Sequence, residues 1–317
     1  MALLLSLAAT AVACQVPVFR YAFEQWNPEQ YRVLILAGEQ RSEFQAMAKE
    51  LGSSEKGKNS ALNVQVDVMS PDSNPIAARL WKEHNVNGKP IAVTLYPERA
   101  RGIGGSVAHV TTASRDNLQA IFDSPVRREI AKRLGQGESA VWVLLECGNE
   151  KKDAAARENL EKQLAEDAKW LELPTPEEME VKPEVLEAVK VKLRVGFSLI
   201  RLRADDPEEQ FLVDMLLSSE SDLRDFDEPI AFPVFGRGLV LYALVGKGIA
   251  PDTIRGASKF ICGPCSCQVK EQNPGFDMLL KNEWEQAIGE VKISSPLPTV
   301  DATPELIPIP SGRSKRK

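Results

Sequence analysis

Histidine is scarce in this 317-residue chain, which contains two, His84 and His109. Neither belongs to an HExxH zinc motif or stands near a GxSxG nucleophile motif, so the signatures of zinc proteases and serine hydrolases are missing. We therefore expect both histidines to be surface or hydrogen-bonded polar groups. The glycine-rich stretch 102–106 precedes a predicted strand, which excludes a phosphate-binding loop.

The chain also lacks an excess of positive charge and long apolar runs. Its formal net charge is −6, whereas phosphate binding needs a basic face, so no nucleic-acid partner is expected. The basic stretch Arg313-Ser-Lys-Arg-Lys317 is interpreted as part of a disordered, proline-rich tail over residues 294–317. Because no later segment approaches ~18 consecutive apolar residues, we predict that the mature protein is not an integral membrane protein.

The N-terminus has the pattern of an export signal. Residues 3–12 are almost entirely apolar, and Ala11-Val-Ala13 supplies small residues for a signal peptidase, although no Lys or Arg precedes the run. We predict a signal peptide over residues 1–13 and an extracytoplasmic location, periplasmic or secreted. Cys14 follows directly, in a context that resembles a lipobox with Ala11 in place of Leu. Lipidation of Cys14 is one alternative, and would be the only link to a membrane; an unmodified thiol is the other.

The remainder predicts an α/β protein built from two similar units, in residues 14–137 and 138–260. A helix over residues 17–26 comes first, since its apolar residues recur at helical spacing. In the first unit, alternating and apolar patterns predict strands at 30–37, 62–69, 90–96 and 106–112, and helices at 42–51, 75–84 and 115–134, the last one broken at Pro125. In the second, they predict strands at 140–145, 193–202, 229–235 and 239–245, and helices at 151–171, 207–217 and 251–260.

Short matching sequences in the two units support a duplication of one unit. Gly38 and Gly148 each follow the first strand of a unit, and Pro-Ile-Ala begins a strand at both Pro90 and Pro229. The second unit is longer, and the acidic, proline-containing stretch 174–190 is the predicted insertion. It is interpreted as a linker with one helical turn.

This order of elements resembles the thioredoxin-like fold, in a tandem arrangement like that of protein disulfide isomerases and calsequestrins. The resemblance covers about residues 30–260. It implies a central mixed sheet flanked by helices, a CxxC motif where the first strand meets its helix, and a facing proline, usually cis, at Pro90 and Pro229. The sequence departs from this pattern, because Ala37-Gly-Glu-Gln40 and Cys147-Gly-Asn-Glu150 stand at the CxxC positions. Thioredoxin-type dithiol chemistry is therefore not expected at either position.

Cys147 is the first candidate for chemistry. A helix that begins just after it would stabilise the thiolate and lower the pKa of the thiol. A single thiol can form a mixed disulfide, but it needs a second cysteine to complete dithiol exchange. The competing interpretation is a structural cysteine.

The second candidate is the sequence Cys262-Gly-Pro-Cys265-Ser-Cys267, within a predicted cysteine-rich extension over residues 261–293. It contains the thioredoxin tetrapeptide, but a helix precedes it where thioredoxin has a strand. Three roles stay open: disulfides that staple the extension, thiol–disulfide redox chemistry, or binding of Zn(II) or Cu(I) with Cys147 or Cys14 as a fourth ligand. Disulfides compete with a metal for these thiols in an oxidising compartment.

These observations predict an exported, non-enzymatic interaction or scaffold protein that needs no cofactor and binds a protein partner. The alternatives are a thiol–disulfide oxidoreductase and a soft-metal binding protein.

Overall fold

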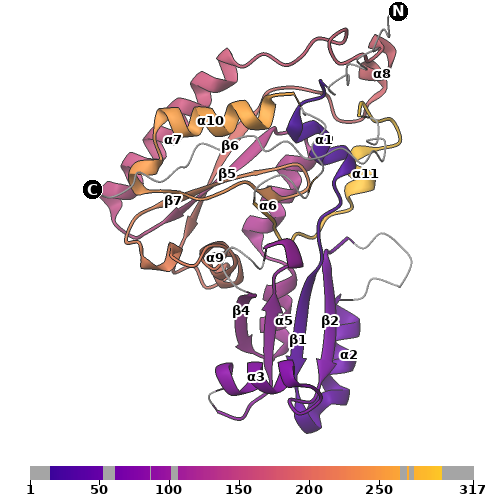
Figure 1. Ribbon diagram of the computed structural model, residues 1–317, viewed down its shortest axis with the longest axis vertical. Helices are drawn as coiled ribbons and strands as arrows, with labels where there is room; N and C mark the ends of the chain where they lie inside the picture. The colour runs from indigo at the N-terminus through magenta and orange to yellow at the C-terminus, as the bar shows by residue number, and fades with distance from the viewer. Residues whose placement is uncertain are drawn as a thin grey trace, which may run out of the picture.

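The computed structural model describes residues 15–52, 61–85, 87–100, 106–264, 270 and 275–294. It is an α/β structure with two mixed sheets, each flanked by helices (Figure 1). The predicted signal peptide, Cys14, Cys265, Cys267 and most of the predicted tail lie outside the described residues. No helix within the described ranges combines the length and hydropathy needed to cross a bilayer.

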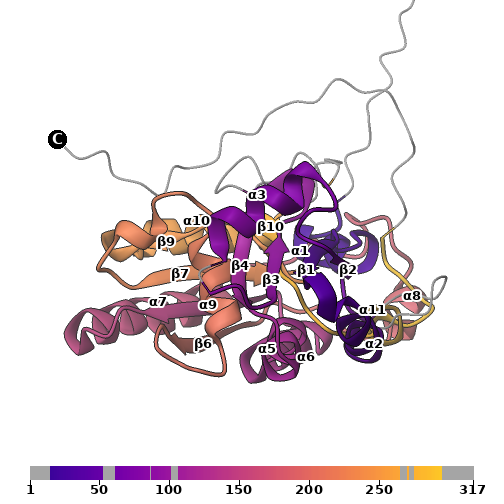
Figure 2. The ribbon, with the colours of Figure 1, turned by 90° about the horizontal axis from the view of Figure 1, so that it is seen from below.

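The first sheet has the strand order β2-β1-β3-β4. Its strands are β1 (Tyr31–Leu36), β2 (Val64–Met69), β3 (Ile91–Leu95) and β4 (Val107–Thr112). β1 and β2 run parallel, with Tyr31 opposite Val64, and the other two pairings are antiparallel. The helices α2 (Arg41–Gly52) and α5 (Arg115–Phe122) cover one face, and α3 (Pro75–His84) covers the other (Figure 2).

The second sheet repeats this arrangement and extends it. Its strands are β5 (Ala140–Glu146), β6 (Phe197–Arg203), β7 (Ile230–Phe235), β8 (Leu239–Val240), β9 (Leu244–Val245) and β10 (Phe276–Asp277). The order is β10-β8-β7-β5-β6, with β9 also paired to β7. As in the first sheet, the first two strands of the unit, β5 and β6, are parallel, and β7 runs antiparallel to β5.

Helices on both faces explain why β5 is an almost continuous apolar run. Ala140, Trp142 and Leu144 face the core beneath α7 (Glu150–Trp170) and α10 (Pro251–Cys262). The alternate residues of the strand face the core that includes α9 (Gln210–Leu217) and α6 (Pro125–Gly135). Every residue of β5 is buried as a result.

The predicted elements are found with small shifts. The predicted helix at 115–134 is indeed two helices, since Pro125 is the first residue of α6. The linker contains α8 (Pro183–Ala188), and α1 (Val18–Gln25) is the predicted first helix. The predicted strand at 239–245 is interrupted, and β8 and β9 pair with different ends of β7. Short 3-10 helices complete the set: η1 (Gly38–Gln40), η2 (Glu98–Ala100), η3 (Leu223–Asp225) and η4 (Gly246–Gly248).

The described residues contain no cis peptide bond, so the bonds that precede Pro90 and Pro229 are trans. The structure thus departs from the cis proline that the family resemblance implies.

The C-terminal extension, residues 275–294, joins the two units. β10 pairs with β8 of the second sheet, and Lys281 then forms a bridge with Leu62, just before β2 of the first. α11 (Trp284–Ile288) follows, and the described extension ends at Ser294. The buried Glu24 of α1 accepts hydrogen bonds from the backbone N–H groups of Ile293 and Ser294, at 3.1 and 2.7 Å. Ser294, predicted as the first tail residue, is therefore packed.

The two units also contact each other through α9. The buried Arg127 of α6 lies over the Phe211 ring, with its guanidinium carbon 4.6 Å from the ring centroid. Glu209 accepts hydrogen bonds from the Ser124 hydroxyl and the Val126 N–H. These contacts tie the start of α9, in the second unit, to α6 of the first.

The two histidines are placed as follows. Nδ1 of His109 in β4 lies 2.7 Å from an Asp214 carboxylate oxygen of α9, so His109 is a hydrogen-bonded polar group. His84 is partly exposed at the end of α3.

Candidate functional site

Cys147 lies at the carboxyl end of the parallel pair β5 and β6, the edge at which open α/β sheets bind ligands. After Glu146 the chain turns at Gly148, whose φ of +83° favours glycine. Asn149 then caps α7, since its side-chain oxygen accepts a hydrogen bond from the Lys152 N–H at 3.2 Å. A cavity of about 330 Å³ opens here, lined by residues 146–148, 153 and 203–205.

The carboxylate of Asp153 occupies the backbone donors of this turn. It accepts hydrogen bonds from the Cys147 N–H at 2.9 Å and from the Gly148 N–H at 3.0 Å. Asp153 is buried in the first turn of α7, so this contact is part of the packed structure. Two backbone donors of this turn are therefore already satisfied by an internal anion and do not stabilise a thiolate at Cys147.

The pKa of the Cys147 thiol is raised above its ordinary value. Partial burial is the largest cause, and Asp153 adds both a hydrogen bond to the protonated thiol and an electrostatic penalty on the thiolate. A backbone hydrogen bond from Asn149 and the charge of Lys152 oppose the shift without cancelling it. This contradicts the lowered pKa expected from the helix N-terminus. At neutral pH the thiol is protonated and a poor nucleophile.

The other charged groups around the cavity pair with one another. A carboxylate oxygen of Glu146 lies 2.6 Å from Nε of Arg201, and Arg203 pairs with Asp205 at 2.9 Å. The described ranges contain no group of three or more His, Cys, Asp or Glu residues that could hold a metal ion. Within these ranges, no metal site of that kind is formed at this edge.

Cys262 lies at the other end of the same strand. It is the last residue of α10, it is 2% exposed, and its thiol hydrogen-bonds with Ser139, the residue before β5. Burial raises the pKa of this thiol to about 12. Because β5 separates Ser139 from Cys147 by eight residues at ~3.3 Å each, the two thiols lie roughly 26 Å apart. Both are free, and the structure does not bring Cys147 to Cys262, the cluster cysteine that lies within the described residues.

Cys265 and Cys267 lie outside the described residues, but their flanks are fixed. Pro264 forms an antiparallel bridge with Pro17, and the Val18 N–H donates to the Gly263 oxygen at 2.9 Å. On the other side, Lys270 is buried and pairs with Asp277 at 2.5 Å. Gly263 and Pro264, the last described residues before Cys265, thus lie beside the start of α1.

Sequence reasoning missed the residues that decide the chemistry here. Asp153 was read as part of a long helix, although an Asn cap followed by acidic first-turn residues is a known helix-start signal. Glu24 was also missed. Its spacing of four residues from Arg20 is a visible helical ion pair, but its contact with Ser294 spans the whole chain.

No protein-family model matches this chain, and no curated protein sequence matches it. What it does must therefore be argued from the geometry described above.

Proposed function

We propose that this chain is a tandem thioredoxin-like protein that binds another protein and does not catalyse thiol–disulfide exchange. The strand order and directions support the family assignment, since each unit has two parallel strands followed by two antiparallel ones in the order 2-1-3-4. The two units, residues 14–137 and 138–260, then correspond to two copies of one fold.

The hydrogen bonds from the Cys147 and Gly148 N–H groups to Asp153, together with the raised pKa of the Cys147 thiol, support the non-enzymatic proposal. A thioredoxin-type nucleophile needs a thiolate at this position, with N–H donors free to stabilise it. Here the donors bind Asp153, the pKa of Cys147 is raised, and Glu150 stands where a second cysteine would be. The cavity beside Cys147 remains a surface for a partner rather than a centre for exchange.

We further propose export, with residues 1–13 as a signal peptide and an extracytoplasmic location. In that setting a disulfide between Cys14 and Cys265 or Cys267 would staple the extension. Cys14 precedes Pro17 by three residues, and the two cluster cysteines follow Pro264 by one and three. Three residues span at most ~10 Å, so the Pro17–Pro264 bridge keeps these thiols within reach of one another.

The reaction is a thiol–disulfide exchange with an external disulfide such as oxidised glutathione. Two protein thiols lose two protons and two electrons, one S–S bond forms in the protein, and the external disulfide is reduced to two thiols. Peptide mapping of protein from an oxidising compartment, without reduction, should find Cys14 linked to the cluster and Cys147 free. Five free thiols, or a lipid on Cys14, would contradict the staple.

The enzymatic alternative is tested by reduction of insulin with dithiothreitol as the electron donor. We expect the protein to give the rate of a variant in which Cys147, Cys262, Cys265 and Cys267 are all Ser. A rate clearly above that control would favour the oxidoreductase alternative at the cluster and overturn the non-enzymatic proposal. A soft-metal site, the remaining alternative, predicts stoichiometric Zn or Cu in protein isolated under reducing conditions.

A further inference from the structure

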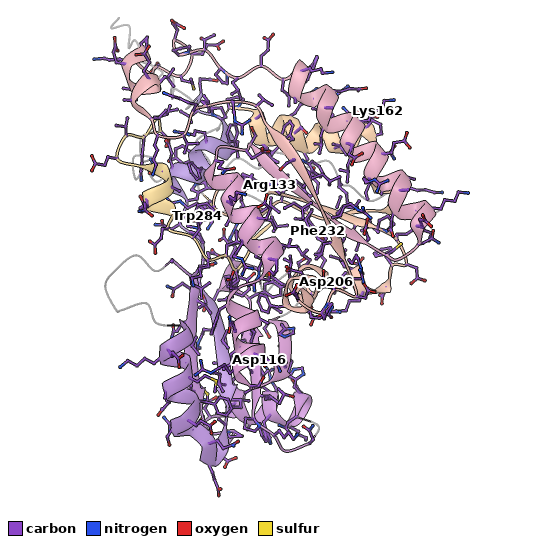
Figure 3. The ribbon with its side chains drawn as sticks, turned by 180° about the vertical axis from the view of Figure 1, so that it is seen from behind. Asp116, Arg133, Lys162, Asp206, Phe232 and Trp284 are labelled. Carbon is purple, nitrogen blue, oxygen red and sulfur yellow. The ribbon has the colours of Figure 1, made fainter. Side chains whose placement is uncertain are left out.

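A second cavity, here called the junction pocket, lies where the two units and the extension meet. It has a volume of about 190 Å³ and is formed by four segments that are distant in the sequence. These are the α1–β1 connection, the residues before β2, the β7–β8 turn and residues 280–285 of the extension. Figure 3 shows Trp284, one of its lining residues, on α11 beside the second unit. Interfaces between units are preferred positions for small-molecule sites.

Two polar side chains make the wall of the pocket rigid. Arg237, 5% exposed, donates to the Phe23 oxygen and to Oδ1 of Asn27, both at 2.8 Å. Asn63 donates to the Glu29 and Met278 oxygens at 2.9 and 3.2 Å. It also accepts a hydrogen bond from the Leu280 N–H at 3.0 Å. Because these contacts cross all four segments, the pocket is formed before any ligand binds.

Other polar groups of the lining are uncommitted. Within the described ranges, the side chains of Gln30, Asn282 and Glu283 make no hydrogen bond or ion pair, and Asn27 uses only its oxygen. Each primary amide offers two donors and a carbonyl acceptor, and the carboxylate offers acceptors alone. Leu62, Leu280 and Trp284 supply buried apolar surface. The pocket therefore combines amide groups and apolar area, a lining that suits a molecule with both hydroxyl groups and C–H faces.

Charge pairing argues for a neutral ligand. Arg237 lies 2.8 Å from a carboxylate oxygen of Glu285, and Lys292 lies 3.2 Å from the other. Partial burial pushes the pKa of Glu285 up, but these two cations hold it below its ordinary value, so the carboxylate is ionised and satisfied. The carboxylates of Glu283 and Glu285 would repel an anionic ligand, and the one cationic residue of the described lining, Arg237, is already paired with Glu285. The volume equals that of about six water molecules at ~30 Å³ each, which is the size of one small ring.

We propose that the junction pocket binds a neutral, hydroxyl-rich molecule of the size of a single sugar ring. Asn282 and Gln30 hydrogen-bond its hydroxyl groups, and the apolar surface of Leu62 and Trp284 contacts its C–H face. This site is independent of Cys147 and of the thioredoxin-like assignment.

The test is titration of the full chain with D-glucose, D-galactose and D-mannose, followed by ligand-observed NMR and calorimetry. We expect saturable binding of at least one sugar with a dissociation constant of about 1 mM or tighter. Asn282→Ala and Gln30→Ala should each weaken it by about fivefold or more, as expected for loss of one hydrogen bond worth ~1 kcal/mol. Gln65→Ala, at an exposed glutamine of β2 outside the pocket, is the matched control and should bind like the parent.

Absence of binding by all three sugars at about 50 mM, far above that dissociation constant, would overturn the proposal. Equal affinity in parent and pocket variants would also overturn it, because the sugar would then bind elsewhere. D-glucosamine, which carries an ammonium group, tests whether the pocket prefers a cationic ligand. Tighter binding of this amine than of glucose, abolished by Glu283→Gln, would show that the ligand is an ammonium compound and contradict the neutral class. Since Gln30 is exposed, Gln30→Ala keeps the test valid even if Asn282→Ala fails to fold.

Discussion

Partial burial and one carboxylate, that of Asp153, keep the Cys147 thiol protonated. Asp153 satisfies the two N–H groups of the turn and places a negative charge near the sulfur. A cysteine beside a helix N-terminus is commonly read as activated. In this chain Asp153 occupies the N–H groups of Cys147 and Gly148 in the turn before the helix, and its charge opposes the thiolate.

Asp153→Ala should therefore make Cys147 more reactive. It frees two N–H donors and removes the nearby anion, so the pKa of the thiol falls and its alkylation by iodoacetamide at pH 7 becomes faster. Loss of the two hydrogen bonds to the turn should also lower the free energy of unfolding by about 1–3 kcal/mol. Mass spectrometry of the Cys147 peptide gives the rate. Asp205→Ala, an exposed acidic residue of the same cavity, is the control, and an equal acceleration there would refute the specific role of Asp153.

Cys262 predicts a pH dependence at the alkaline end. Its folded-state pKa of about 12 exceeds that of an unfolded thiol, ~8.5, so the folded state holds its proton more tightly. This contribution to stability is complete below pH ~8.5 and is lost as the pH rises toward 12. Chemical denaturation at pH 8 and at pH 10.5 should show a smaller decrease in stability for Cys262→Ala than for the parent. Equal decreases in both proteins would contradict the buried, protonated thiol.

At the scale of the element, α1 is unusual because almost all of its residues are buried. Arg20 and Glu24 form a buried ion pair at 2.6 Å, and Glu24 also holds Ile293 and Ser294. The helix therefore has no solvent face over most of its length. It acts as the anchor for the end of the extension.

Glu24→Ala should detach the last residues of the extension. It leaves Arg20 as an unpaired buried cation and removes three hydrogen bonds from residues 293–294, so we expect a destabilisation of about 3–5 kcal/mol. Hydrogen exchange should accelerate at residues 290–294. Glu129→Ala, which removes the partly exposed ion pairs with Lys132 and Arg133 within α6, should cost below ~1 kcal/mol. A similar small cost for Glu24→Ala would contradict the anchor.

The elements themselves were largely predictable, because apolar periodicity and Pro placement are local properties. Pro75 and Pro125 begin helices, as the fixed φ of proline favours. The strand β5 is predicted from its continuous run of apolar residues. The path of the extension was not predictable. It depends on Glu24, Arg237 and Asn63 meeting backbone groups more than 200 residues away, and no local pattern encodes such contacts.

The position of Cys147 at the end of a strand was predicted from the sequence, but the raised pKa of its thiol was not. The end of the first strand of the second unit was recognised from Cys147-Gly148, while the pKa of the thiol depends on the fold of the first helical turn. The separation of Cys147 from Cys262 likewise follows from the length of β5, which places the start of α7 and the end of α10 at opposite edges of the sheet.

At the scale of the whole molecule, the extension and α9 hold the two units together. β10 completes the second sheet, Lys281 reaches the first unit, and α9 carries the contacts to Arg127 and His109. We therefore expect the units to unfold as one body.

Deletion of residues 275–317 should separate that unfolding into two transitions in calorimetry. It removes the β10 pairing and every contact of Asp277, Met278 and Leu280 with the first unit. Deletion of residues 295–317 retains all described contacts and should unfold like the full chain. A single unchanged transition in the longer deletion would show that contacts outside the extension suffice to couple the units.

We propose that Cys147 stands at the place of a catalytic thiol in a thioredoxin-like unit without acting as one. The most direct measurement is the rate of iodoacetamide alkylation of Cys147 against pH, followed on its own peptide by mass spectrometry. The account predicts a single titration with an apparent pKa above the ordinary value of a free thiol, ~8.5. An apparent pKa below 7, at the level of a thiol activated for exchange, would contradict it.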